Sequence, residues 1–597
     1  MKNGDQKKRD TVAQWAFDTR ALLERFHLWL EDVEVSYLNL DGTSGHEPLR
    51  QLSFLNSRME SLFALTGAVT ALGTRLFGRY GEGAGLDKPG LNQVKKEADA
   101  ISAYVMSESL WYLSRQLPEN HAILVCLGEG LMPKAGESPE MGANPQLGFG
   151  RVYARPEVAQ WVDKRVHRLL NDPDFTWLDF YDQLREARIT IWGAAIDTLE
   201  NTSRFAKGAE TGPMTVLHLF NQPLIISKPY EGYMGTLILP EAVVDAAADE
   251  SILIDYHTPR SLVLKAIETA YPGIERKHIH VWTLRGKSRE KRIGTLWQAW
   301  QDLGVDLIED GWLMPNGMSA FTESGTYAPT YHTRTWTDGS GKRHLFLCDG
   351  YAASAEAMQA ASLYPLVGAR AFLSLFSSSF KLSYDIEWRL MAQDPNASGF
   401  AADLKERLPD DVGEEMIERY RQMVLEAVDA GMPAGSRSIE ADRFFPEKTW
   451  RLLAVSGFMC DDPYSGLPGV EEVGKGIYRV TTRLASSRGQ KVICFTLRLK
   501  EPLKPSRLVF NPLLIRFFAG EDFRTRAVKI SDSGRIRNEL QTLCSEALEF
   551  LPSEKIKVVF ERIPAEVISM ENQRQLKEIL TWYKENHPLW FSWLILE

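Results

Sequence analysis

Apolar and polar residues follow two different spacing patterns along this chain, and the first predicts helices. In residues 10–80 apolar side chains recur at helical spacing, as Leu22 and Phe26 do. Such a repeat is typical of amphipathic helices that cover a core. The same spacing predicts a long helix at 93–116 and further helices within 155–188.

The second pattern consists of short apolar runs separated by helical segments. It begins with a buried strand at 122–127 and dominates residues 189–365. Alternation of this kind predicts an α/β core. Within it we expect strands at 278–284, 305–311 and 345–351, with a helix at 294–304.

These patterns divide the chain into four segments. The predicted fold class is α/β, in the α+β layered sense, with an added C-terminal α+β module. That module is expected to contain a hairpin and two helices. The segments are an N-terminal helical region (1–84), an α/β core (85–395), a helical connector (396–450) and the C-terminal module (451–597), whose hairpin lies at 476–499 and whose helices lie at about 535–550 and 571–585.

Composition narrows the class of protein. The 597 residues are 44% hydrophobic and 25% charged, with a net charge of −10, so general nucleic-acid binding is not expected. Five scattered cysteines without a CxxC pair favour free thiols in a reducing compartment. Because no apolar run reaches the length of a membrane span and residues 1–17 lack a signal-peptide core, we expect a cytoplasmic protein.

Candidate chemistry is concentrated in residues 191–219. An apolar strand is predicted to end in a tight turn that holds Asp197, Glu200 and Thr202. Hard cations such as Mg²⁺ prefer such oxygen ligands, and a threonine hydroxyl beside them can orient a water molecule. The pattern therefore suggests metal-assisted hydrolysis of a phosphate ester, although acids at strand ends also serve as ordinary turn and cap residues.

Further motifs occur in a fixed order around this one. Taken together, the series resembles class II fructose-1,6-bisphosphatases, within the lithium-sensitive, metal-dependent phosphatase superfamily. The similarity covers roughly residues 85–365. The matching stretches are Gly128-Glu129-Gly130, the segment from Asp197 to Thr202 with the AKGAETGPMTVLHL that follows it, YMGTLILPEAVVDAAADESILIDYHTP (233–259), the segment 278–311, and Gly350 to Ala357.

The resemblance implies a sugar-phosphatase-like core that uses Mg²⁺ or Mn²⁺. It implies that Thr202 positions the attacking water, with Asp197 and Glu200 beside it in the catalytic centre. The early aspartate ligand of the family matches two positions here, Asp87 and Asp99, and the sequence does not choose between them. The implied metal ligands are Glu129, Asp197, Glu200, Glu356, and Asp87 or Asp99.

The resemblance also implies a substrate side to the site. Tyr233 falls where the family contacts its sugar phosphate, and a basic run lies at the start of a predicted helix. A helix N-terminus with added cations favours an anion, whereas the ordinary interpretation of a charge run is a solvated face. The run consists of Arg285, Lys287, Arg289, Lys291 and Arg292.

Several positions depart from the family pattern, mostly on the substrate side. Leu131 replaces a second acid, Asn201 a glycine and Trp312 an aspartate, while Ala352 and Ala353 replace two glycines. We therefore expect hydrolysis of a small phosphorylated metabolite, a sugar phosphate or bisphosphate, without naming fructose bisphosphate. The alternatives are a degenerate phosphatase-like binding or scaffolding protein and a metal-dependent sugar-phosphate lyase or isomerase. The C-terminal module could form a lid or a homo-oligomer interface.

Overall fold

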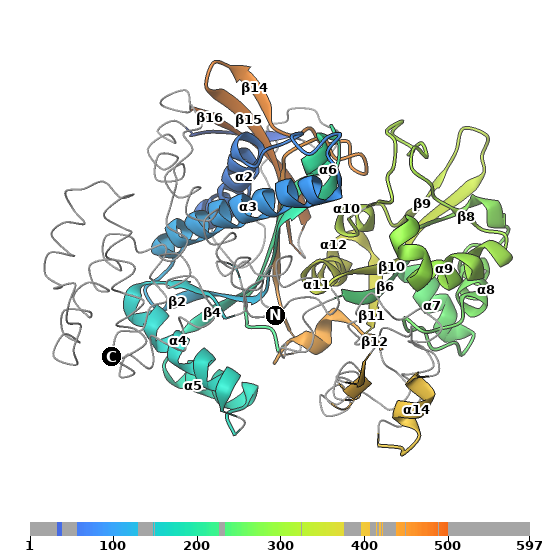
Figure 1. The fold of residues 1–597 in the computed structure, drawn as a ribbon, viewed down its shortest axis with the longest axis horizontal. Helices are drawn as coiled ribbons and strands as arrows, with labels where there is room; N and C mark the ends of the chain where they lie inside the picture. The colour runs from blue at the N-terminus through green and yellow to red at the C-terminus, as the bar shows by residue number, and fades with distance from the viewer. Residues whose placement is uncertain are drawn as a thin grey trace, which may run out of the picture.

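The chain folds into helices and two mixed β-sheets, which confirms the α/β class (Figure 1). We describe it from a computed structural model. The description covers residues 33–38, 57–128, 150–172, 174–225, 233–323, 325–374, 396–405, 438–447, 449–486 and 489–498, together with a few single positions between them. The expected helices at 535–550 and 571–585 lie outside the described residues.

The first sheet has nine strands and carries most of the candidate site. Its strands pair antiparallel except β2 and β4, which are parallel. In spatial order they are β1 (Val33–Leu38), β16 (Gly489–Arg498), β15 (Ile477–Ser486), β13 (Leu452–Phe458), β5 (Met214–Phe220), β4 (Thr190–Glu200), β2 (His121–Leu127) and β3 (Val152–Ala154), with β14 (Glu471–Gly474) on β15.

Two predictions are wrong within this sheet: the separation of residues 451–498 from the core and the helical state of residues 33–38. Residues 451–498 do not form a separate module, because β13 pairs along its whole length with β5, from Leu452 opposite Phe220 to Phe458 opposite Met214. The predicted hairpin is confirmed as β15 and β16, and it extends the same sheet. Residues 33–38, expected to be helical, form the edge strand β1. Long-range strand pairing overrode the local apolar spacing there.

The second sheet has seven strands and is more strongly mixed. Strand β10 runs parallel to β7 and antiparallel to β6. In spatial order the strands are β12 (Ser438–Ile439), β11 (Ala369–Ser374), β6 (Tyr233–Pro240), β10 (Arg343–Ala353), β7 (Ile279–Trp282) and β8 (Asp306–Leu307), with β9 (Arg334–Thr337) on β10. The short β12 comes from the expected helical connector, whose described part also includes α14 (Phe400–Lys405) and the 3-10 turn η3 (Ala441–Phe444).

Helices cover both sheets. The pair α2 and α3 packs on the first sheet, and α7, α8 and α9 lie beside the second (Figure 1). The helical elements that cover the sheets are, in chain order, α2 (Ser57–Phe77), α3 (Lys88–Gln116), α4 (Pro156–Asn171), α5 (Trp177–Glu186), α6 (Thr202–Lys207), α7 (Glu241–Asp249), α8 (Arg260–Ala270), the 3-10 turn η2 (Arg276–His278), α9 (Lys287–Asp302), α10 (Tyr327–Thr330), α11 (Ser354–Ser362) and α12 (Tyr364–Val367).

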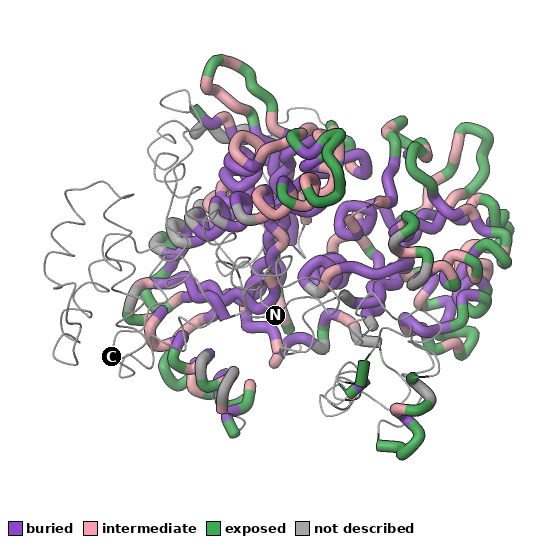
Figure 2. Tube along the Cα trace, viewed as in Figure 1, coloured by how far each residue is buried: buried purple, intermediate pink, exposed green. Residues whose placement is uncertain are grey.

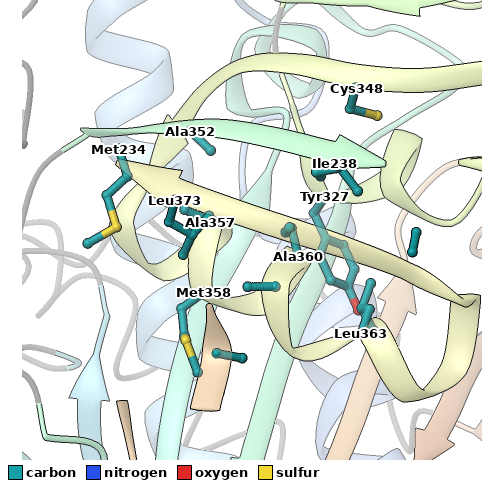
Figure 3. Packing of buried hydrophobic residues seen from close by; sticks show 14 of the residues in the cluster. Met234, Ile238, Tyr327, Cys348, Ala352, Ala357, Met358, Ala360, Leu363 and Leu373 are labelled. Carbon is teal, nitrogen blue, oxygen red and sulfur yellow. The ribbon is translucent and has the colours of Figure 1, made fainter. Parts of the chain in front are cut away.

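Helix α11 lies between the two sheets and contacts both β4 and β6. Its sequence, SAEAMQAAS, is rich in alanine, so the sheets can approach it closely. Ala357 and Ala360 of α11 lie against Met234, Ile238 and Leu373 of the second sheet (Figure 3). The buried part of the chain runs through both sheets and this helix, whereas α5 and α9 expose one side (Figure 2). The sandwich thus places residues of α11 next to residues of β4.

Candidate functional site

The candidate site is built around the end of β4. The strand continues through Asp197 to Glu200, so the predicted acidic turn is extended backbone with a register shift in its pairing to β5. Asn201 then adopts a left-handed conformation (φ 67°), and its side-chain amide donates to the Gly212 carbonyl at 3.0 Å. Asparagine tolerates this conformation better than most residues. The reversal starts α6 at Thr202.

The charges of three carboxylates act on one another's neighbourhood at this strand end, those of Asp197, Glu200 and Glu356. Burial, followed by the neighbouring charge of Glu356, raises the pKa of Asp197 to about 7, and the charge of Asp99 adds to the effect. Burial and the charges of Glu356 and Asp197 raise the pKa of Glu200 well above its ordinary value. Within the described residues, Oε1 of Glu200 is buried without a hydrogen-bond partner. Such a cluster favours either shared protons or a cation.

Glu356 reaches the cluster from the first turn of α11. Its carboxylate accepts the backbone N–H of Thr326 and, at 3.3 Å, that of Tyr327. The segment that supplies these amides passes close to β4, because a Cβ added at Gly325 would lie 2.7 Å from Oε1 of Glu200. Glycine at this position therefore allows the second sheet's loop to close over the acids of the first sheet.

Thr202 and Asp99 form the second part of the site. The Thr202 hydroxyl lies 3.0 Å from Oδ1 of Asp99 and 2.9 Å from the Leu199 carbonyl, and it can donate to either. Asp99 belongs to α3, which packs on α6. Asp87, the other candidate, is the exposed N-cap of α3 and accepts the Gly90 N–H at 2.9 Å. Of the two candidates for the early aspartate, Asp99 therefore contacts Thr202, whereas Asp87 caps its own helix.

Gln359 connects the two elements that carry the acids, and no motif in the sequence pointed to it. It follows Glu356 by one turn of α11, and its Nε2 lies 2.9 Å from the Ala195 carbonyl of β4 and 3.3 Å from the Val216 carbonyl of β5. Ala195 is two residues before Asp197. The buried amide therefore sets the position of α11 relative to the acid-bearing end of β4.

A buried hydrogen-bond chain supports the same arrangement. The Ser362 hydroxyl donates to the Gln359 carbonyl at 2.9 Å, so it accepts from Nδ1 of His218 at 2.8 Å. Nε2 of His218 then accepts from the Tyr327 hydroxyl at 2.8 Å. Burial lowers the pKa of His218 to about 3, which keeps the imidazole neutral. The chain joins α10 and α11 through a strand of the first sheet.

The predicted substrate residues are only partly described. Arg285 lies over the Trp297 ring and 3.6 Å from Glu309, while Lys287 is exposed at the start of α9. Arg289 donates to the carbonyl of Glu323 at 2.5 Å. The side chains of Tyr233, Lys291 and Arg292 lie outside the described set, as does all of Glu129. Two of the five basic residues thus contact the protein itself.

Glu323 joins the two halves of the molecule beside the acids. Its carboxylate binds Arg204 at 3.1 Å and Lys207 at 2.7 Å, both on α6. Arg204 also donates to the Thr211 carbonyl at 3.0 Å. These contacts fix the loop of the second sheet against the helix that carries Thr202.

Within the described residues, no three His, Cys, Asp or Glu side chains converge closely enough to hold a metal ion as they stand. Among the same residues, no helix is long and apolar enough to cross a membrane. No protein-family model and no curated protein matches this sequence.

Proposed function

We propose that the protein is a metal-dependent hydrolase of a small phosphorylated metabolite, a sugar phosphate or bisphosphate, in the cytoplasm. The observation that carries the proposal is the group formed by the partly buried Asp197 and the buried Glu200 and Glu356. The charge of Glu356 raises the pKa of both Asp197 and Glu200, and the charge of Asp197 raises the pKa of Glu200 further. Carboxylates held close together with raised pKa values are common in active sites. A divalent cation removes the repulsion, because it supplies positive charge to all three groups.

The donor set fits Mg²⁺ or Mn²⁺. Asp197, Glu200, Glu356 and Asp99 offer only oxygen, which hard cations prefer, and Oε1 of Glu200 has an unused acceptor in the described structure. Glu129 is the further ligand that the family resemblance implies. When bound, the ion would activate water and neutralise charge on the phosphoryl group.

The roles of the other residues follow from their contacts. The Thr202 hydroxyl, held between Asp99 and the Leu199 carbonyl, keeps acceptor capacity for an incoming water. Asp99 is then the carboxylate that can accept a proton from that hydroxyl. Lys287 and the amides at the start of α9 supply positive potential for a substrate phosphate, and Tyr233 stands as the proposed sugar-phosphate contact.

The test is release of inorganic phosphate from a panel of sugar mono- and bisphosphates, with Mg²⁺ or Mn²⁺. We expect Asp197→Asn to abolish turnover, and Asp87→Ala, which removes only an exposed cap, to retain it. Calorimetric titration with Mn²⁺ supplies a readout apart from activity. If metal-supplemented wild type releases no phosphate across the panel, hydrolysis is refuted.

One observation favours a second candidate. Because the described acids do not converge into a ready three-ligand group, a degenerate phosphatase-like core that binds a metabolite without turning it over also fits. A degenerate core predicts that the wild type binds Mn²⁺ weakly and that Thr202→Ala binds the metabolite as tightly as the wild type does. A lyase or isomerase would bind the metal and convert the sugar phosphate without releasing phosphate, so product analysis separates it from both.

A further inference from the structure

Four side chains form a continuous hydrogen-bonded row at the edge of the second sheet, away from the acids of β4. His280 of β7 lies 2.6 Å from Asp306 of β8 through Nδ1, and 2.8 Å from Nδ1 of His344 through Nε2. Nε2 of His344 lies 3.2 Å from Asp338, in the turn that joins β9 to β10. The row therefore connects three strands of one sheet, β8, β7 and β10, with the turn between β9 and β10.

The row needs one proton more than two neutral histidines carry. Ionised carboxylates only accept, so both outer nitrogens, Nδ1 of His280 and Nε2 of His344, must carry hydrogen. Two neutral imidazoles have then used both of their N–H groups. The inner nitrogens would face each other at 2.8 Å with two lone pairs, unless a third proton lies between them. If a carboxyl held that proton instead, the total for the row would be unchanged.

The surroundings favour a positive charge on this pair. The two imidazoles are nearly coplanar, at 9°, and the Trp336 ring lies almost parallel to both, at 22° to His280 and 14° to His344. An aromatic face stabilises a cation placed over it. The Lys342 amide, then the Ser340 hydroxyl and amide, hold the pKa of Asp338 below its usual range, so this carboxylate stays ionised.

The geometry suits a proton better than a metal ion. A metal between two facing imidazoles needs about 2.0 Å on each side and would hold the nitrogens about 4 Å apart, which is longer than the observed 2.8 Å. His278 does not join the row, because it belongs to the turn η2 and its ring lies 4.4 Å from that of His344 at a tilt of 35°.

Other titratable groups near the row do not supply the missing proton. Burial, then Arg334 and His280, lowers the pKa of His332 to about 3, and burial, then His344, lowers that of His278. Both are therefore neutral near pH 7. The remaining facing charges are Lys342 and Lys277, both paired with Glu275, and Arg334 on β9.

We propose that His280 and His344 bind one shared proton, and that this proton latches the β9–β10 hairpin onto β7 and β8. Losing the proton leaves two facing lone pairs, and the hairpin loosens. Because the folded row holds an additional proton, its contribution is present at low pH and is lost as pH rises. The proposal does not depend on the phosphatase assignment.

The test uses the full chain with ¹⁵N-labelled histidine and a matched variant. In wild type we expect a strongly deshielded proton coupled to His280 and His344. Amide exchange in β9–β10 should become faster as pH rises, after correction for intrinsic rates. His344→Gln retains a donor toward His280 without needing the additional proton, so its pH dependence should be flat.

Two results would overturn the proposal. One is a wild-type spectrum with two neutral tautomers and no shared proton. The other is an equal pH dependence of hairpin exchange in wild type and His344→Gln. The spectrum is recorded with chelator and then with Zn²⁺, and a histidine signal that exists only with Zn²⁺ would assign the row to a metal and also refute the shared proton.

Discussion

Neutralising two aspartates, the fully buried Asp349 and the partly buried Asp197, should change stability in opposite directions. Asp349 forms a fully buried pair with Arg260, with 2.9 Å between Oδ1 and Nη2, and accepts the Trp300 N–H at 2.6 Å. Asp197 instead faces other acids. Removing charge from a buried ion pair leaves its partner uncompensated and costs about 3–5 kcal/mol. Removing it from an acid cluster relieves repulsion.

The magnitude for Asp197 follows from its pKa. The folded value of about 7 lies above the ordinary 3.8, so the folded state keeps a proton that the unfolded chain releases between these two pH values. Stability therefore falls as pH rises through this window. The full shift corresponds to about 4 kcal/mol. Because the side chain is only partly buried, solvent screening reduces the expected effect to about 2 kcal/mol.

The assay is thermal or urea unfolding of metal-free wild type, Asp197→Asn and Asp349→Asn at about pH 5 and about pH 8. We expect Asp197→Asn to exceed wild type at the higher pH and to approach it at the lower one, whereas Asp349→Asn is less stable at both. Mn²⁺ should then raise the wild-type midpoint but not that of Asp197→Asn. The reasoning fails if Asp197→Asn is destabilised to the same extent at both pH values.

Three further predictions concern the roles of single residues. Thr202→Ala should lower phosphate release by about 10²-fold or more while Mn²⁺ affinity measured by calorimetry stays within about twofold, and an equal loss of both would assign Thr202 to folding instead. Asp99→Asn should reduce the rate comparably, whereas Asp87→Ala should cost only about 1 kcal/mol of stability from the lost cap and leave the rate intact; the reverse ranking would contradict the assignment of Asp99. Gln359→Met keeps the side-chain volume but loses the hydrogen bonds to β4 and β5, so it should weaken Mn²⁺ binding in a folded protein. Gln359→Glu tests whether an added carboxylate increases the charge repulsion around Glu356. Wild-type Mn²⁺ affinity in Gln359→Met would exclude a positioning role for Gln359.

Local signals predicted much of the secondary structure. The helix expected at 93–116 is the main part of α3, and the strands expected around Val281 and Leu347 are β7 and β10. Two of the elements misjudged, β1 and β13, depend on pairing with strands far away in the chain. The spacing of apolar residues within one segment does not indicate which distant strand it pairs with. Residues 451–498 were therefore expected to form a separate module, although they are part of the first sheet.

The acids of the site were predictable as residue types but not as a geometry. Asp197, Glu200 and Thr202 share one short segment, so their proximity follows from the sequence. Choosing Asp99 required knowing that α3 packs on α6. Gln359 and His218 could not be found at all, because their roles are hydrogen bonds to partners more than a hundred residues away.

The energetic cost of the acid cluster bears on whether the core is degenerate. Asp197 and Glu200 keep raised pKa values because burial and Glu356 act against their ionisation. The fold enforces this proximity from two sheets at once, through Gln359 on β4 and through the amides of Thr326 and Tyr327 on Glu356. A scaffold that never bound a cation would be more stable with amides or apolar groups at these positions. A site that loads a divalent ion recovers the cost on binding, so the raised pKa values of Asp197 and Glu200 are accounted for by the proposed metal site.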